Sequence, residues 1–370
     1  MKDKLNEIME IEKDNLIKRI IELVKIESVE AKAQPGKPFG EGVSKALHKA
    51  LDIAGNLGFI TKDIDGYMGY AQYGEGEDYI GIFGHLDVVE AKEGWNFGPY
   101  EGIVKDDRIY GRGVLDNKGP IFAALYGLYA IKKLNINLRY PVRIIFGTNE
   151  ESGFKDAMYY LSKEKPPIYG FTPDCKYPVV YGERGRTKIA LKVKNEKELA
   201  NKLFEKVNYF FLQGNPNGER LGIDYKDSEF GILEMRNFSF NIEEDELVFK
   251  FDISYPRGIT IEKILENIRE KLYKEIKMEI IKNYNPVVFD KESFLVKSLQ
   301  KAYEEVTNLD GTPVTTTGGT YAKIIPNIVP FGPSFPGQKG IAHNIDEYMD
   351  IEDIVLNAKI YANAVYNLGK

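Results

Sequence analysis

The chain has 370 residues, of which 43% are hydrophobic and 29% charged, so it can bury a sizeable core and form two domains. Its formal charge of −6 is spread over the chain and gives no basic stripe, so we expect no nucleic-acid partner. The single cysteine, Cys175, excludes an internal disulfide and a cysteine-based zinc site, as is usual in a reducing compartment.

The N-terminal segment, from Met1 to Val29, mixes charges with apolar residues at helical spacing. This pattern predicts an amphipathic helix, whereas a signal peptide needs an uninterrupted apolar stretch. No other run approaches the length of a membrane span. We therefore expect a cytoplasmic protein without a membrane partner.

Between Asp78 and Pro178, apolar runs alternate with a helical pattern, which is typical of an α/β sheet. Each apolar run ends abruptly in polar residues. The predicted strands are Tyr79–Phe83, Val142–Phe146 and Tyr169–Thr172, and the predicted helix is Gly119–Leu134.

From Thr187 the pattern changes to alternating apolar and polar residues, which predicts half-buried antiparallel strands. With a helix from Glu196, a helix over 261–276 and a strand near 277–281, this part predicts a small α+β domain. Longer helices return after Pro286, over 291–306 and after Ile351. We expect a catalytic α/β domain over 1–184 and 287–370, with the small domain inserted over 185–286.

Two of the three histidines, His85 and His343, stand beside acidic residues in turn-like segments. A lone histidine is more often structural than a metal ligand, and His48, inside a lysine-bearing helix, fits that interpretation. His85 differs, because Asp87 lies two residues further along an extended chain, on the same side. The Asp87 carboxylate could then fix the imidazole tautomer, as carboxylates do for zinc-bound histidines.

The acidic candidates are weak one by one. Asp116, in a glycine-punctuated loop, could be a helix N-cap; Glu150 and Glu151 could be a solvated turn; Asp174 could be an ordinary loop aspartate. Together they gain weight, because they fall at the ends of successive apolar runs, where open α/β sheets bind ligands. Nitrogen and oxygen ligands without a thiolate suit zinc, and also manganese or cobalt.

These segments resemble the zinc-dependent aminoacylase, carboxypeptidase and dipeptidase superfamily, and within it the bacterial dipeptidase V group. The resemblance covers the catalytic domain at both ends of the chain. The motifs that carry it are Gly84-His-Leu-Asp-Val-Val89, Gly94-Trp95, Ile109-Tyr-Gly-Arg-Gly113, Asp116-x-Lys-Gly-Pro120, Gly147-Thr-Asn-Glu-Glu151, Pro173-Asp174, Gly318-Gly-Thr-Tyr-Ala322 and Phe331-Gly-Pro-x-Phe-Pro-Gly337.

The resemblance implies a fold and a site. The fold is a zinc-peptidase α/β domain with a central, largely parallel sheet and an inserted α+β lid. Two divalent metal ions would share Asp116, one completed by His85 and Asp174 and the other by Glu151 and His343. Glu150 would be the general base, and we place Asp87, as the residue that orients His85, with it among the catalytic residues. The turn of Gly318, Gly319 and Thr320 would bind a substrate carboxylate through main-chain N–H groups, although a plain turn before a helix is nearly as good an interpretation.

The sequence departs from the family in the lid, which is short and has no histidine between Gly185 and Pro286. Family members use a lid histidine to stabilise the oxyanion, and an identical partner chain would lack it too. Arg257 is one conceivable substitute. We expect hydrolysis of a dipeptide, short peptide or N-acyl amino acid by a monomer or homodimer. The alternative is a non-catalytic, metal-dependent peptide-binding or regulatory protein.

Overall fold

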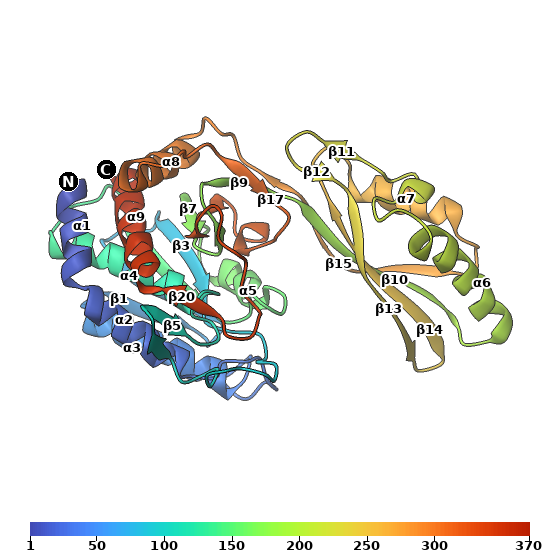
Figure 1. Ribbon diagram of the computed structural model, residues 1–370, viewed down its shortest axis with the longest axis horizontal. Coiled ribbons are helices and arrows are strands. Elements are labelled where there is room, and N and C mark those ends of the chain that lie inside the picture. Colours follow the sequence, from blue (N-terminus) through green and yellow to red (C-terminus); the bar gives the residue numbers. More distant parts are fainter. The chain divides into compact units, whose positions relative to one another are not determined.

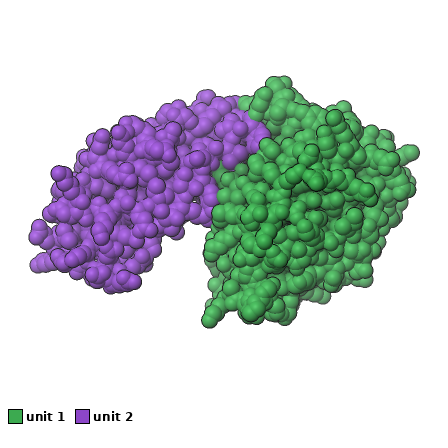
Figure 2. Space-filling model, turned by 180° about the vertical axis from the view of Figure 1, so that it is seen from behind, with its two compact units in different colours: residues 1–180, 290–314, 320–370 green, residues 181–289, 315–319 purple.

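The structure is a computed structural model that describes all residues, 1–370, in two compact units, which Figure 2 distinguishes by colour. Unit 1 comprises Met1–Val180, Asp290–Val314 and Thr320–Lys370, and unit 2 comprises Tyr181–Phe289 and Thr315–Gly319. The chain therefore passes four times between the units. The short segment of unit 2 after Val314 has no counterpart in the domain boundaries that the sequence suggests.

Unit 1 is built on a six-stranded sheet in the order β1-β2-β6-β3-β7-β18. The pairs β6–β3, β3–β7 and β7–β18 are parallel, whereas β1–β2 and β2–β6 are antiparallel. The predicted α/β fold with a largely parallel sheet is thus confirmed. The strands are β1 (Ile60–Ile64), β2 (Met68–Tyr73), β3 (Ile80–His85), β6 (Val142–Gly147), β7 (Tyr169–Thr172) and β18 (Ile328–Pro330).

The central strands β3 and β6 are buried at every residue, which explains their continuous apolar runs. Helix α4 lies against both strands and is itself covered by α9 (Figure 1). Gly127 permits this packing, because a Cβ atom there would lie 2.8 Å from the main-chain nitrogen of Ala362. The helices of unit 1 are α1 (Lys2–Ile11), α2 (Lys13–Val24), α3 (Glu41–Asn56), α4 (Lys118–Lys133), α5 (Lys155–Lys163), α8 (Phe294–Thr307) and α9 (Ile351–Gly369).

The N-terminal segment differs from the single helix that the sequence predicts. It forms α1 and α2, which meet at Glu12, whose largely buried side chain bonds to Asn15 and Lys133. No helix of the chain has both the length and the apolar character needed to cross a bilayer.

Smaller sheets lie outside the six-stranded sheet of unit 1 and the four-stranded sheet of unit 2. One has the order β20-β5-β4, and another pairs β19 with β8. A three-stranded sheet, β16-β9-β17, includes residues at two of the four unit boundaries, because β9 spans the one after Val180 and β17 the one after Val314. These strands are β4 (Ile103–Lys105), β5 (Arg108–Tyr110), β8 (Cys175–Lys176), β9 (Val180–Glu183), β16 (Val287–Val288), β17 (Val314–Thr316), β19 (Pro333–Ser334) and β20 (Tyr348–Asp350).

Unit 2 is a four-stranded antiparallel sheet in the order β13-β14-β10-β15, packed against helices in one apolar cluster. The alternation of Ile189, Leu191 and Val193 supplies part of this core. This is the α+β lid architecture that the sequence predicts, with β13 as a further strand. The elements are β10 (Gly185–Lys194), α6 (Lys197–Val207), η1 (Asn208–Leu212), η2 (Glu219–Leu221), β11 (Lys226–Asp227), β12 (Gly231–Ile232), β13 (Glu234–Glu243), β14 (Glu246–Tyr255), α7 (Ile261–Lys271) and β15 (Lys277–Tyr284).

Candidate metal centre

Four of the acidic or histidine candidates lie at the carboxyl ends of three adjacent parallel strands. His85 is the last residue of β3 and pairs with Gly147, the last residue of β6, so that Glu150 and Glu151 follow beside it. Strand β7 lies on the other side of β3 and leads into Asp174. The parallel order therefore gathers candidates that are far apart in the sequence at one edge of the sheet.

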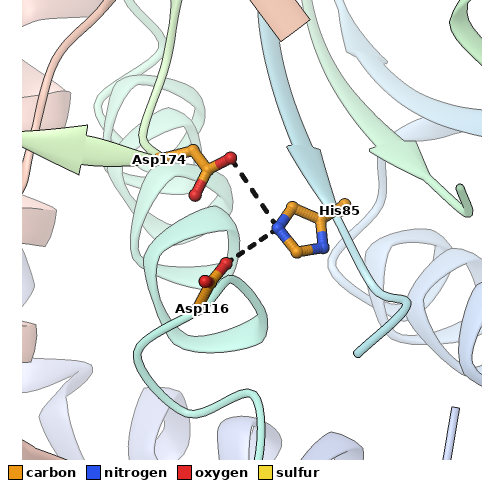
Figure 3. A group of neighbouring side chains, drawn as sticks. All are labelled: His85, Asp116 and Asp174. Carbon is orange, nitrogen blue, oxygen red and sulfur yellow. Dashed lines mark hydrogen bonds and ion pairs between the residues drawn. The ribbon is translucent and has the colours of Figure 1, made fainter. Parts of the chain in front are cut away.

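The first potential ligand group contains His85, Asp116 and Asp174. The Nε2 atom of His85 lies 2.9 Å from Asp116 Oδ1 and 3.7 Å from Asp174 Oδ2. Figure 3 shows the imidazole ring facing both carboxylates. One donor atom from each residue lies within 4.8 Å of the others, which is compatible with a single bound cation.

The second group contains Asp116, Glu151 and His343, and so shares Asp116 with the first. The Nε2 atom of His343 lies 3.0 Å from Asp116 Oδ2 and 2.9 Å from Glu151 Oε1. The two oxygens of Asp116 therefore point to different histidines. His343 is reached from solvent, since its side chain is 50% exposed.

The carboxylates of the site favour the protonated form of both histidines. Burial by itself would lower the pKa of His85, but hydrogen bonds to Asp116, Asp174 and Asp87 raise it well above its usual value. Hydrogen bonds to Asp116 and Glu151 raise the pKa of His343 to about 10. Burial would raise the pKa of Asp116, but the two histidines hold it far below its usual value. Positive charge is thus favoured on both sides of Asp116.

The remaining carboxylates have raised pKa values, because they are buried close to one another. Burial and the neighbouring Asp116 raise the pKa of Asp174 to about 7. Burial raises the pKa of Glu151, with His343 as a partial offset, and burial with the charge of Asp174 raises that of Glu150 well above its usual value. Divalent cations would relieve this repulsion, and the nitrogen and oxygen donors fit zinc, manganese or cobalt.

Asp87 acts differently from the expectation that its carboxylate fixes the His85 tautomer. The nearest partner of His85 Nδ1 is the main-chain carbonyl oxygen of Asp87, at 2.9 Å, whereas the carboxylate Oδ1 is 3.5 Å away. The carboxylate instead accepts the N–H groups of Glu150 and Glu151, at 3.2 and 3.0 Å. Asp87 therefore joins the His85 strand end to the loop of the two glutamates.

Asn117 is a second connecting residue, and its sequence context gave no sign of this role. Its Oδ1 accepts the N–H of His85 at 3.3 Å, and its Nδ2 donates to the carbonyl oxygen of Pro173 at 2.6 Å. Gly84 leaves room for it, because a Cβ atom there would lie 2.4 Å from Asn117 Oδ1. Asn117 is fully buried and links three ligand-bearing segments.

Glu347 and Arg112 form a buried ion pair beside the Asp116 loop, which sequence reasoning also missed. Glu347 Oε2 accepts from Arg112 Nη1 at 2.6 Å, and both side chains are almost completely buried. Glu347 Oε1 accepts three main-chain N–H groups, those of Gly113 at 3.1 Å, Leu115 at 2.9 Å and Asp116 at 3.1 Å. Since Glu347 follows His343 by four residues, it ties the Asp116 loop to the His343 segment.

Open space adjoins the second ligand group within unit 1. A cavity of about 570 Å³ is lined by Glu151 and by residues near Val29 and Val88, and another of about 620 Å³ is lined by His343 and residues 89–93. A ligand from solvent can therefore reach Glu151 and His343.

The predicted carboxylate turn has internal hydrogen bonds of its own. The N–H of Gly318 donates to Thr316 Oγ1 at 3.2 Å, and Thr320 Oγ1 accepts the N–H of Ala322 at the start of the 3-10 helix η3 (Tyr321–Lys323). The Gly318 amide is therefore already engaged.

Arg257, the conceivable substitute for the lid histidine, is engaged inside unit 2. Its Nε donates to Asp227 at 3.1 Å and its Nη2 to Glu229 at 2.8 Å, while the guanidinium lies over the ring of Phe230. Serving as an oxyanion donor would require it to leave two carboxylates.

Comparison with known proteins gives consistent matches over the whole chain. The model of peptidase family M20/M25/M40 matches residues 81–367. A relative from Bacillus subtilis (strain 168), named putative dipeptidase YtjP, is 30% identical over 456 residues, covering 97% of this chain and 98% of the relative. The aligned length exceeds 370 residues, so this relative contains segments that the present chain lacks.

Solved structures show the same fold at lower identity. Human carnosine dipeptidase 1 has a TM-score of 0.78 and 16% identity, over 99% of this chain and 98% of that one. The YXEP protein of Bacillus subtilis, titled a dinuclear metal binding peptidase, has a TM-score of 0.63 and 14% identity, over 95% of this chain and 98% of that one. The family match, the similarity to YtjP and the candidate ligand groups together show that this chain belongs to peptidase family M20/M25/M40 and is a metallopeptidase.

Proposed function

We propose that this metallopeptidase is a two-metal hydrolase that cleaves the amide bond of a dipeptide, short peptide or N-acyl amino acid. Asp116 would bridge two divalent ions, preferably zinc, with His85 and Asp174 on one and Glu151 and His343 on the other. Glu150 would be the general base. The observation that carries the proposal is the arrangement of Asp116, whose two oxygens each approach a different histidine.

The reaction follows from what each side chain can do. Bound divalent ions would supply polarisation of the scissile carbonyl and a more acidic attacking water. Glu150 belongs to neither ligand group, so its carboxylate is available to take the proton of that water and pass it to the leaving amine nitrogen. Asp87 orients Glu150 by accepting its main-chain N–H.

The substrate class rests on the family and on the turn at Gly318, Gly319 and Thr320. A carboxylate held by main-chain N–H groups would select substrates that end in a free carboxyl group, as dipeptides and N-acyl amino acids do. C-terminally amidated analogues should then be poor substrates.

The test compares wild type with Glu150→Gln on libraries of dipeptides and N-acyl amino acids, after loading with zinc or manganese. Loss of a general base lowers turnover by roughly a hundred- to ten-thousand-fold. Glu90→Gln is the matched control, because Glu90 is an exposed carboxylate that lines both adjoining cavities. Metal analysis should find two equivalents in all three proteins. Equal turnover by wild type and Glu150→Gln on every substrate would end the proposal.

The second candidate function is a family member that binds metal and peptide but has lost most of its turnover, because the lid contains no histidine. Loss of an oxyanion donor typically lowers turnover by about a hundred- to a thousand-fold. Calorimetry with metal-loaded protein separates the two. Tight peptide binding with the peptide recovered intact after prolonged incubation would favour the binding protein.

A further inference from the structure

The loop after β6, which carries Glu150 and Glu151, is fixed by two buried carboxylates. Asp156 Oδ2 accepts the N–H of Thr148 at 2.7 Å and that of Asn149 at 2.9 Å. The next two N–H groups, of Glu150 and Glu151, go to the two oxygens of Asp87. Four consecutive main-chain donors are thus divided between two side chains, and these set where the glutamates lie.

Asp156 has a third partner from a distant part of the chain. Its Oδ2 also accepts the hydroxyl of Tyr321 at 2.5 Å, and both side chains are completely buried. Gly147 makes this approach possible, since a Cβ atom there would lie 1.8 Å from the Tyr321 oxygen and 2.9 Å from Asp156 Oδ2. Tyr321 directly follows Thr320, the residue at which the chain returns to unit 1.

Helix capping does not account for these contacts. Asp156 lies in the first turn of α5, where an acidic residue is favourable for any helix. The N-cap residue of α5 is Phe154, and the contact of Asp156 within the helix is the N–H of Ala157, which donates to Oδ1 at 2.7 Å. All three donors on Oδ2 come from outside α5, and two of them belong to the segment directly before Glu150.

We infer that Asp156, held by the Tyr321 hydroxyl, is a positioning residue that sets the location of Glu150 for proton transfer. The inference rests on the proposed function, in which Glu150 is the base. Charged hydrogen bonds to a buried carboxylate are about twice as strong as neutral ones, so this arrangement resists displacement of the loop.

Two variants test the inference. Asp156→Asn keeps the shape of the side chain but replaces one carboxylate oxygen by an amide NH2 group. This group cannot accept a hydrogen bond, and it faces either the Ala157 N–H or the three donors that Oδ2 accepts. Tyr321→Phe removes only the hydroxyl. A shift of the base by about 1 Å costs on the order of a hundredfold in rate. At saturating metal we expect kcat to fall about 10-fold in Tyr321→Phe and up to about 100-fold in Asp156→Asn, with KM changed by less than about threefold.

Tyr160→Phe is the matched control. Tyr160 is also a buried tyrosine and belongs to α5, but its hydroxyl lies 3.0 Å from that of Tyr79 and makes no contact with the glutamate loop. We expect its kcat to stay within about twofold of wild type. If Tyr321→Phe and Asp156→Asn lose no more kcat than Tyr160→Phe, or change KM alone, the inference is wrong.

A second measurement keeps the inference separate from the proposed function. Glu151 belongs to the same loop, so displacement of the loop should also weaken zinc binding by about 10- to 100-fold, as measured by competition with a chelating dye. If the wild type cleaved no peptide, the proposed function would fail, and zinc affinity would still test the role of Asp156. Equal zinc affinity in wild type, Tyr321→Phe and Asp156→Asn would refute it.

Discussion

The buried pair of Arg112 and Glu347 predicts a large and strongly coupled loss of stability on mutation. Arg112→Met leaves a buried carboxylate without its cation, and Glu347→Gln leaves a buried guanidinium without its anion. The Nε and Nη2 atoms of Arg112 make no hydrogen bond, so Glu347 is its principal polar partner. Removing one member of a buried pair typically costs about 3–5 kcal/mol.

This cost can be converted into a thermal shift. For a unit of this size, 1 kcal/mol corresponds to roughly 2–4 °C in Tm, so each single variant should lose about 6–20 °C. The double variant has no unpaired buried charge. Its loss in unfolding free energy should be about 1–3 kcal/mol smaller than the sum of the two single losses.

Arg108 and Asp350 supply the control, because this pair lies in the neighbouring strands β5 and β20. The two atoms are 2.7 Å apart, but the side chains are 39% and 38% exposed. Each arginine also lies against an aromatic ring, Arg112 against Trp95 and Arg108 against Tyr348. Because exposed pairs contribute at most about 1 kcal/mol, Arg108→Met should cost far less than Arg112→Met.

The assay is urea unfolding of metal-free protein, followed by tryptophan fluorescence. Trp95 is the only tryptophan, so the signal reports on unit 1. Zinc affinity should also fall by about 10- to 100-fold in Glu347→Gln, because Glu347 holds the N–H of Asp116. The reasoning would be refuted if each single variant lost less than about 1 kcal/mol of unfolding free energy and the double variant lost the sum of the two.

Three further expectations can be checked on the same preparations. Burial and the charge of Asp87 raise the pKa of Asp156 from 3.8 to about 6, so its contribution to stability is largest below pH 4 and is lost as the pH rises through 6. In urea titrations of metal-free protein, Asp156→Asn should remove up to about 3 kcal/mol of the change in unfolding free energy with pH. The same dependence of unfolding free energy on pH in wild type and variant would contradict this expectation. Zinc at a hundred times its Kd should stabilise unit 1 by about 2.7 kcal/mol, and EDTA should reverse the resulting rise in Tm. Gly147→Ala should displace the Tyr321 hydroxyl and lower kcat at least as much as Tyr321→Phe, whereas an unchanged kcat would place that hydroxyl elsewhere.

The sequence predicted the catalytic sheet well because its strands are buried on both faces. Strand β7 was predicted with its observed bounds, and the ends of β3 and β6 differ by one or two residues. Continuous apolar runs that stop at polar residues mark both a strand and its carboxyl end. The ligand candidates could be found for the same reason, since they stand directly at those ends. Their assignment to particular ions stays a prediction.

The supporting residues could not be found this way, because their role depends on long-range contacts. Asp156 looks like an ordinary first-turn aspartate, and Glu347 like one of several acidic residues after His343. What distinguishes them is burial beside main-chain N–H groups of another segment. The β13 strand was missed although Phe238, Phe240 and Ile242 alternate with polar residues. The alternation that starts at Met235 is interrupted before Phe238, where the pairing with β14 shifts register, so the regular run is short.

The segment Thr315–Gly319 limits how this molecule can be dissected. It belongs to unit 2 through hydrogen bonds from Thr315 to Glu229 and from Arg184 to Thr316, yet 25 residues of unit 1, Asp290–Val314, separate it from the rest of that unit. A deletion of 181–289 would leave these five residues without their partners in unit 2, two residues before Tyr321. A protease nick at any single crossing would likewise leave the two pieces joined by the other three. Chimaeras that replace unit 2 by that of a relative should therefore exchange 181–289 and 315–319 together.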